Sequence, residues 1–201
     1  MVARTPQQSV ADHLHILARR PKDPFAHAGL AITYEGLGYI DHALHHYRES
    51  VKFNPRNAAT QVNLACLLCK RGALTEAAAH CAKALEAGGC SGLAHNTLAA
   101  IKGKQDDIGG AIHHAEQALV FEPNNPKIHR NLGALMARRS QTKLALKHYN
   151  RAIVLDPFDA RSRFNVAKCY MSDGKNVVAQ KHTKVGWRLS HPGGPYRVYD
   201  V

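Results

Sequence analysis

The sequence predicts an all-α solenoid, a stack of similar helix pairs, and three observations support this prediction. First, proline or glycine recurs every 34 residues, at Pro21, Pro55, Gly89, Pro123 and Pro157. Second, three columns of small residues keep the same period: Ala43, Ala77, Ala111, Ala145 and Ala179; Ala31, Ala65, Ala99, Gly133 and Ala167; and Ser50, Ala84, Ala118, Ala152 and Gly186. Third, each interval holds two short stretches whose apolar residues have helical spacing. Small side chains let two helices approach closely, proline or glycine ends the second helix, and such a period is typical of a solenoid.

The composition is that of a folded protein with a strong positive charge. Of 201 residues, 45% are hydrophobic, which favours a folded chain. No apolar run approaches the roughly 18 residues of a membrane span, and no stretch resembles a secretory signal. The five cysteines therefore indicate reduced thiols in the cytoplasm or an intracellular organelle. Lysine and arginine number 27 against 15 acids, a net charge of +12, which favours an acidic partner.

Residues 9–20 are expected to form an unpaired helix that caps the first repeat. Val10, Leu14 and Leu17 have helical spacing, and Pro21 ends the segment in phase with the repeats. The alternative is a mitochondrial presequence, because the first 20 residues contain three arginines and a single acid. We favour the cap, since a cleaved leader has no reason to share the period of the repeats.

Each repeat is expected to form two helices joined by a short turn. The first helices are predicted near 25–36, 58–70, 92–104, 126–139 and 160–172, and the second near 41–53, 74–87, 108–121, 142–155 and 176–189. The turns between them hold Gly38, Gly72 and Gly174, which suit a left-handed helix stop. The third and fourth repeats have Asp106 and Ser140 at this position.

Residues 191–201 are expected to form an extended tail, because the Pro-Gly-Gly-Pro sequence at 192–195 excludes a helix. The residues around it are apolar, notably Trp187, Tyr196 and Tyr199. We expect the tail to fold back over the last helix or to be buried in a partner subunit, and the second is favoured because a short turn-initiated tail covers little helix surface. These three aromatic residues are therefore candidates for docking a partner.

The repeats resemble the tetratricopeptide repeat, whose pattern is W-x2-L-G-x2-Y, then A-x3-F, then P. The first repeat reads His27-x2-Leu30-Ala31-x2-Tyr34, then Ala43-x3-Tyr47, then Pro55. The tryptophan position departs from the pattern throughout, with His27, Gln61, His95, His129 and Arg163. The third repeat is the least regular, since Lys102 replaces the usual tyrosine.

The resemblance implies a right-handed α-α superhelix with five repeats. The expected organisation is a capping helix in 1–21, one domain of five repeats in 22–190, and the tail in 191–201. The repeats are placed at 22–57, 58–91, 92–125, 126–159 and 160–190.

In this family the first helices of the pairs line a concave groove, so polar columns on them are candidate binding residues. One such column is Asn63, Thr97, Asn131 and Asn165. An asparagine side chain can pair with both N–H and C=O of an extended peptide. The column resembles the asparagine ladder in the repeat superhelix of the O-linked N-acetylglucosamine transferase. It predicts a groove that holds peptide backbone, although a column of tolerated surface asparagines is the alternative.

A stripe of basic residues is expected to lie beside the asparagines. Its members are Lys70, Lys104, Lys127, Arg130, Arg138, Arg161 and Lys168. No compensating acids are expected on these helices, so the stripe favours an acidic segment over a merely solvated face. The two-carboxylate clamp of the co-chaperone members is disfavoured. Its best frame, repeats 3 to 5, offers only Asn96, Ala100, Asn131, Arg161 and Asn165.

Two further patterns are interpreted as structural. The histidines form a complete column of period 34, at His46, His80, His114, His148 and His182. Equivalent side chains of neighbouring repeats lie about 10 Å apart, too far to share a metal whose ligands lie about 2 Å away. The Cys66-x2-Cys69 pair falls inside a helix rather than at its start, which favours buried packing over redox or zinc chemistry.

These observations predict a non-catalytic scaffold with no cofactor and no metal. No phosphate loop, dinucleotide fingerprint or catalytic triad order is present. The predicted partner is a protein with an extended acidic segment, or neighbouring subunits of a larger assembly. The alternative is a basic subunit of a ribonucleoprotein particle, which the scarcity of aromatic residues for base stacking disfavours.

Overall fold

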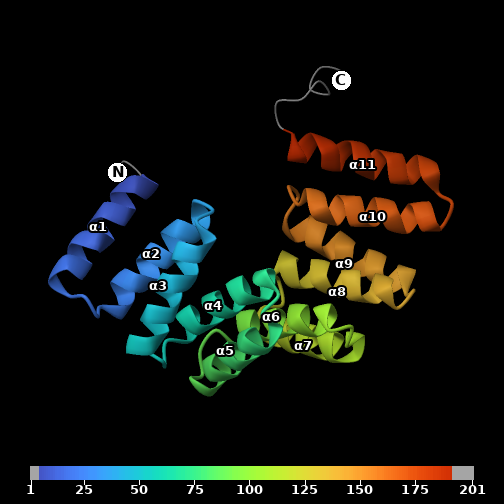
Figure 1. Ribbon diagram of the computed structural model, residues 1–201. Helices are drawn as coiled ribbons and strands as arrows, with labels where there is room; N and C mark the ends of the chain where they lie inside the picture. The colour runs from blue at the N-terminus through green and yellow to red at the C-terminus, as the bar shows by residue number, and fades with distance from the viewer. Residues whose placement is uncertain (1–4, 192–201) are drawn as a thin grey trace. The chain divides into compact units, whose positions relative to one another are not determined.

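The computed structural model describes residues 5–191, and this part of the chain is all-α (Figure 1). Residues 5–191 contain eleven α-helices and no strand. Their bounds are α1 Pro6–Arg19, α2 Pro24–Gly36, α3 Ile40–Phe53, α4 Ala58–Arg71, α5 Leu74–Glu86, α6 Ser91–Lys104, α7 Ile108–Phe121, α8 Pro126–Arg138, α9 Thr142–Leu155, α10 Ala160–Ser172 and α11 Asn176–Ser190. In the described residues no helix is long and apolar enough to cross a bilayer. Tyr196 and Tyr199 lie outside the described residues.

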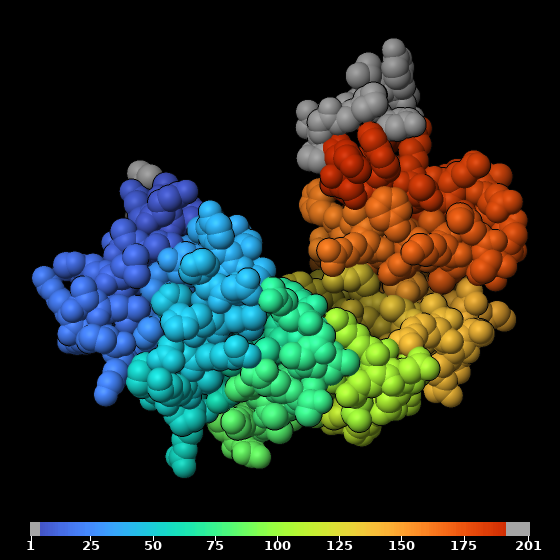
Figure 2. All heavy atoms as spheres, in the orientation of Figure 1, coloured from blue at the N-terminus to red at the C-terminus, as the bar shows by residue number. Residues whose placement is uncertain are grey.

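The chain divides into two compact units, residues 1–101 and 102–201. The first contains α1 to α5 and most of α6, and the second contains the end of α6 and α7 to α11. The division falls inside the stretch that the sequence assigns to a single domain. It lies in the third repeat, beside Lys102, where the sequence departs most from the repeat pattern. Within each unit, the side chains of successive helices form a continuous packed surface (Figure 2).

The ten repeat helices begin and end within one residue of the positions predicted from the sequence. We call the first helix of each pair the A helix (α2, α4, α6, α8 and α10) and the second the B helix. Four A helices share a side-chain N-cap one period apart, provided by Asp23, Asn57, Asn125 and Asp159. Each accepts a hydrogen bond from a backbone N–H that the helix itself cannot pair, which fixes the start of the helix.

The three columns of small residues are buried, as the sequence predicted. The alanines of the first column, for example, are at most 1% exposed. Gly133 shows why size matters here, because a Cβ atom at this position would lie 2.6 Å from Cδ1 of Tyr149 on the paired B helix. In the first unit the alanine columns border a core that includes Leu44, Tyr47 and Leu68. The columns therefore mark the lines along which helices meet.

The turns between paired helices adopt the predicted left-handed backbone. Gly38, Gly72 and Gly174 have φ angles of 82°, 85° and 72°. Asp106 and Ser140 adopt the same conformation, with φ angles of 64° and 59°. The turn geometry is thus conserved along the chain even where glycine is replaced.

Helix α1 packs on α2 in the manner of a B helix, and no A helix precedes it within residues 5–191. It begins with a capping box, in which Thr5 and Gln8 exchange side-chain and backbone hydrogen bonds. A Cβ atom at Gly29 would collide with the ring of His13, so glycine allows α1 to lie close to α2. None of the α1 residues is fully buried, which leaves its outer face to solvent within the described structure.

Candidate functional site

The predicted asparagine column is only partly available to a ligand. Asn63, Asn131 and Asn165 are half-buried on α4, α8 and α10. Thr97 is 4% exposed, so its prediction as a groove residue is wrong. Its hydroxyl donates to the carbonyl of Leu93 at 2.8 Å and lies 3.1 Å from Sγ of Cys66. Threonine at this position therefore bonds within its own helix rather than reaching outward.

Three residues of the basic stripe have acidic partners, contrary to the expectation from the sequence. Nζ of Lys70 lies 2.7 Å from Oε1 of Glu35 on α2. Arg138 donates to Oδ1 of Asp106 at 2.5 Å and to the carbonyl of Gly103 at 2.6 Å. The acids belong to the preceding repeat or to a turn, so inspection of each A helix by itself does not find them.

The third of these partners is the N-cap of α10. Nη1 of Arg130 donates to Oδ2 of Asp159 at 2.6 Å, and Oδ2 also accepts from the hydroxyl of Ser162 at 2.6 Å. Oδ1 accepts from the backbone N–H of Arg161 at 3.1 Å. Burial opposes ionisation of Asp159, but the hydrogen bonds from Ser162 and Arg130 outweigh it and hold its pKa below the ordinary value. The ion pair between Arg130 and Asp159 therefore connects α8 to α10, and it neutralises the charge of Arg130.

Three of the four remaining cations lie on two helices of the second unit that are in contact. Lys127 on α8 and Lys168 and Arg161 on α10 are exposed, and their charged groups pair with no acid in residues 5–191. Asn131 follows Lys127 by one helical turn, and Asn165 stands in the same relation to Arg161, so each helix presents them on one face. Helices α8 and α10 are in contact. We call this set of five residues the α8/α10 face.

The other predicted residues do not join this face. Asn63 and Lys70 belong to the first unit. Lys104 is exposed at the end of α6. Trp187 lies on α11, where its indole stacks on the ring of His191 with centroids 4.6 Å apart.

In three repeats the column histidine on the B helix pairs with the residue that replaces tryptophan in the repeat pattern. Nδ1 of His27 lies 2.9 Å from Nδ1 of His46, and the same atoms of His129 and His148 are 3.2 Å apart. In the second repeat Gln61 takes the place of the first histidine and pairs with the B-helix histidine, His80, at 2.6 Å.

The A-helix member of each pair also binds a carbonyl six residues before it. His27, Gln61 and His129 bond in this way to Pro21, Pro55 and Pro123 at 3.1, 2.8 and 3.1 Å. The pairs thus tie the A helix, the B helix and the preceding turn together. Two imidazoles are too few for a metal site, and the described residues contain no group of three or more histidine, cysteine or acidic side chains placed to hold an ion.

Two of the four cysteines of the first unit are buried in its packing. Cys69 and Cys81 are buried, whereas Cys66 is partly exposed. Burial raises the pKa of the Cys81 thiol to about 12, so this group stays protonated and unreactive.

The paired histidines make the fold sensitive to acid. Burial, followed by the neighbouring rings of His27, His45 and His42, lowers the pKa of His46 to about 4, while Glu49 opposes this effect. Burial and then His129 and Lys147 lower the pKa of His148, with Glu116 acting in the opposite direction. The unfolded chain then binds more protons than the folded chain below about pH 6.5. Stability is complete above that pH and falls as the pH decreases toward the folded pKa.

We expect acidification from pH 7.5 to 5.5 to cost up to about 1 kcal/mol for each such histidine, because partial solvent access reduces the full linkage value. Denaturant titrations that follow Trp187 report on the second unit, since it is the chain's single tryptophan. His148→Gln keeps a hydrogen-bonding side chain and should flatten the pH dependence of this unit. The matched control is His113→Gln on the exposed side of α7. An equally steep decline in His148→Gln and the parent protein would show that this pair is not responsible.

Comparison with known proteins identifies the family. The model of the tetratricopeptide repeat family matches residues 28–89 and 97–160, which together are more than half of the chain. The chain belongs to the tetratricopeptide repeat family. The all-α class and the tetratricopeptide fold predicted from the sequence are thereby confirmed. A search of curated proteins found no match.

Several solved structures share the tetratricopeptide fold. PilW, described as a widely conserved type IV pilus biogenesis factor, has a TM-score of 0.82 at 20% identity, over 94% of this chain and 88% of PilW. PilF of Pseudomonas aeruginosa has a TM-score of 0.77 at 18% identity, over 94% and 86% of the two chains. YrrB, described as a tetratricopeptide protein with an unusual peptide-binding site, has a TM-score of 0.62 at 16% identity, over 92% and 94%. At these identities the likeness shows the fold alone.

Proposed function

We propose that this chain is a non-catalytic scaffold that holds an extended acidic segment of a partner protein on the α8/α10 face. The observation that carries the proposal is the presence of three unpaired cations around two asparagines on adjacent A helices. The asparagines supply donors and acceptors for peptide backbone, and the cations attract carboxylates. The peptide-binding site of the fold relative YrrB is consistent with this use of a tetratricopeptide scaffold.

The distance between the two helices sets the interval between the peptide residues that they can contact. Neighbouring packed helices lie about 8–10 Å apart, which corresponds to about three residues of extended peptide. Asn131 and Asn165 are therefore expected to contact backbone groups about three residues apart. Acidic side chains at the same interval would meet Lys127, Arg161 and Lys168. A suitable probe is a labelled peptide with glutamate at every third position and small polar residues between.

We expect Asn131→Ala combined with Asn165→Ala to weaken binding of this probe about tenfold, because each lost hydrogen bond contributes about 0.5–1.5 kcal/mol. Fluorescence anisotropy measures the affinity. Lys168→Glu should weaken binding further and reduce its salt dependence, whereas Lys143→Glu, the same charge change on the B helix α9, should leave it unchanged.

Thermal melts show whether the variants remain folded. Equal affinity in all variants would exclude the α8/α10 face. The alternative function, contact with nucleic acid through the net charge of +12, predicts binding of random RNA that weakens steeply with salt. RNA binding stronger than probe binding would replace the proposal by that alternative.

A further inference from the structure

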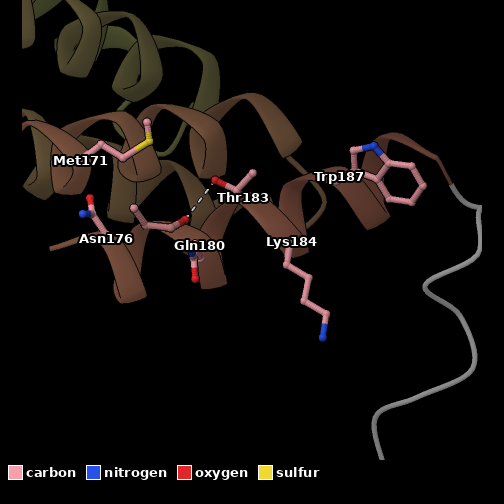
Figure 3. A pocket seen from close by; sticks show the side chains of 7 residues that line it. Met171, Asn176, Gln180, Thr183, Lys184 and Trp187 are labelled. Atoms are coloured by element: carbon pink, nitrogen blue, oxygen red, sulfur yellow. Dashed lines mark hydrogen bonds between the residues drawn. The ribbon is translucent and has the colours of Figure 1, made fainter.

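The outer face of α11 carries a pocket of about 690 Å³ that the proposed function does not use. Ala179 lines it on α11. Thr183 and Trp187 on α11 and Met171 on α10 line it as well (Figure 3). Asn176, Gln180 and Lys184 complete its lining. All seven residues belong to the second unit, so the pocket lies within one compact body.

Three earlier B helices are in contact with the A helix that follows them: α3 with α4, α7 with α8, and α9 with α10. Tyr149 of α9 is 3% exposed, whereas Thr183, one period later on α11, is exposed. No A helix follows α11 in the described residues. The pocket therefore lies at the position that the following A helix occupies beside α7 and α9.

At two positions α11 is more polar on this face than most of the earlier B helices are. Gln180 stands where earlier B helices have Leu44, Ala78, Ile112 and Leu146. Asn176 stands where they have Ile40, Leu74, Ile108 and Thr142. Amide groups at these positions make permanent burial under another repeat unfavourable. Trp187 and Met171, which is 54% exposed, keep part of the face apolar. Mixed polar and apolar surface of this kind suits a reversible partner rather than a further repeat.

Charge restricts the occupant. Helix α11 contains Lys181, Lys184 and Arg188 and no acidic residue. A second copy of the chain, with its net charge of +12, would be repelled from such a helix. Residues 192–201 contain one arginine and one aspartate, so their side chains carry no net charge. An acidic segment of a partner protein has the complementary charge.

We propose that the α11 face binds an amphipathic helix of a partner protein, with small apolar side chains in the pocket and acidic residues along its edges. The occupant is a helix because the pocket repeats the surface that holds an A helix elsewhere in the chain, and laying a helix into an apolar groove is a common mode of recognition. The site is separate from the α8/α10 face, which is proposed to bind an extended segment. The scaffold can therefore hold two segments at once.

The test uses a synthetic peptide of about 20 residues, long enough to form a helix in water, with leucine and alanine on one face and glutamate on the other. Control peptides replace glutamate by lysine or scramble the apolar pattern. Trp187, the single tryptophan, lines the pocket and reports binding directly. We expect the acidic helix to change its emission in a saturable manner. Gln180→Glu combined with Lys184→Glu should weaken binding at least about tenfold, and Lys143→Glu on α9 should not.

The two proposed sites are distinguished by exchanging variants and probes. The affinity of the helical probe should be the same for the parent protein and for the double alanine variant of Asn131 and Asn165. The affinity of the extended probe should likewise be unchanged by the double glutamate variant. Equal binding of the acidic, basic and scrambled peptides overturns the inference. A chain truncated after His191 that binds the helix more tightly would show that residues 192–201 are the occupant. A concentration-dependent dimer abolished by the double glutamate variant would show that a second copy is.

Discussion

Ala145→Leu lowers the free energy of unfolding of the second unit by about 1–3 kcal/mol or more, since overpacking of a well-packed interior costs this much. Ala145 is 0% exposed on α9 and belongs to the small-residue column that marks where helices meet. Three additional carbon atoms have no free space at this position. The α8–α9 hairpin must then open or the leucine must leave its preferred rotamer.

The measurement is a denaturant titration followed by Trp187 emission, which reports on the unit that contains α9. Ala137→Leu is the matched control, because Ala137 is exposed near the end of α8. It should change the unfolding free energy by less than about 0.5 kcal/mol. If leucine at 145 is tolerated as well as leucine at 137, the assignment of this column to helix contacts is wrong.

The helices could be located from the sequence because the same pattern is repeated five times. A single alanine such as Ala145 is weak evidence, but its recurrence at every 34th position fixes the phase of all ten repeat helices. Local signals agree with this phase, including Pro126 at the start of α8 and Gly174 at a left-handed turn. Agreement between local and long-range signals is characteristic of a well-specified fold.

The partners of the basic residues could not be found by considering one helix at a time. Stacking brings residues that are about one period apart into contact. Arg130 and Asp159 are 29 positions apart, and Arg138 and Asp106 are 32 apart. A search for opposite charges separated by roughly one period would have indicated these pairs. The same reasoning, applied within a repeat, would have shown that His27 and His46 face each other.

The repeat pattern also could not predict how deeply each member of a column is buried. Thr97 occupies the same column as Asn131, and their places in the period are identical. The hydroxyl of Thr97 can satisfy itself on the preceding helical turn, so that the residue can be enclosed between neighbouring helices. Asn131, whose amide carries more hydrogen-bonding groups than a hydroxyl, is half-buried. Side-chain chemistry therefore decided which members of the column remain accessible.

Asp159→Ala is expected to destabilise the second unit by about 2–4 kcal/mol. Asp159 is 7% exposed and combines two roles, as N-cap of α10 and as partner of Arg130. Loss of an N-cap costs about 1 kcal/mol, and breaking a buried ion pair costs about 3–5 kcal/mol. The side chain of Arg130 is 20% exposed, so its charge can regain water, which places the total below the sum. The titration followed by Trp187 measures this change directly.

Arg130→Ala and the double variant Arg130→Ala/Asp159→Ala complete a thermodynamic cycle. The control is Asp173→Ala, because Asp173 is exposed and lies 3.9 Å from Nζ of Lys175. The double variant should be more stable than the sum of the single changes indicates, because the two residues act on one interaction. Strict additivity, or a loss of unfolding free energy no larger than that of Asp173→Ala, would show that the Arg130–Asp159 ion pair does not contribute to stability.

Arg130→Ala should also change the affinity for the extended acidic probe by no more than about twofold, measured below the melting temperature of the variant, because a neutralised charge contributes little to binding. A larger loss of affinity would show that Arg130 contacts the peptide, as the sequence predicted, and that its role is not limited to connecting α8 and α10.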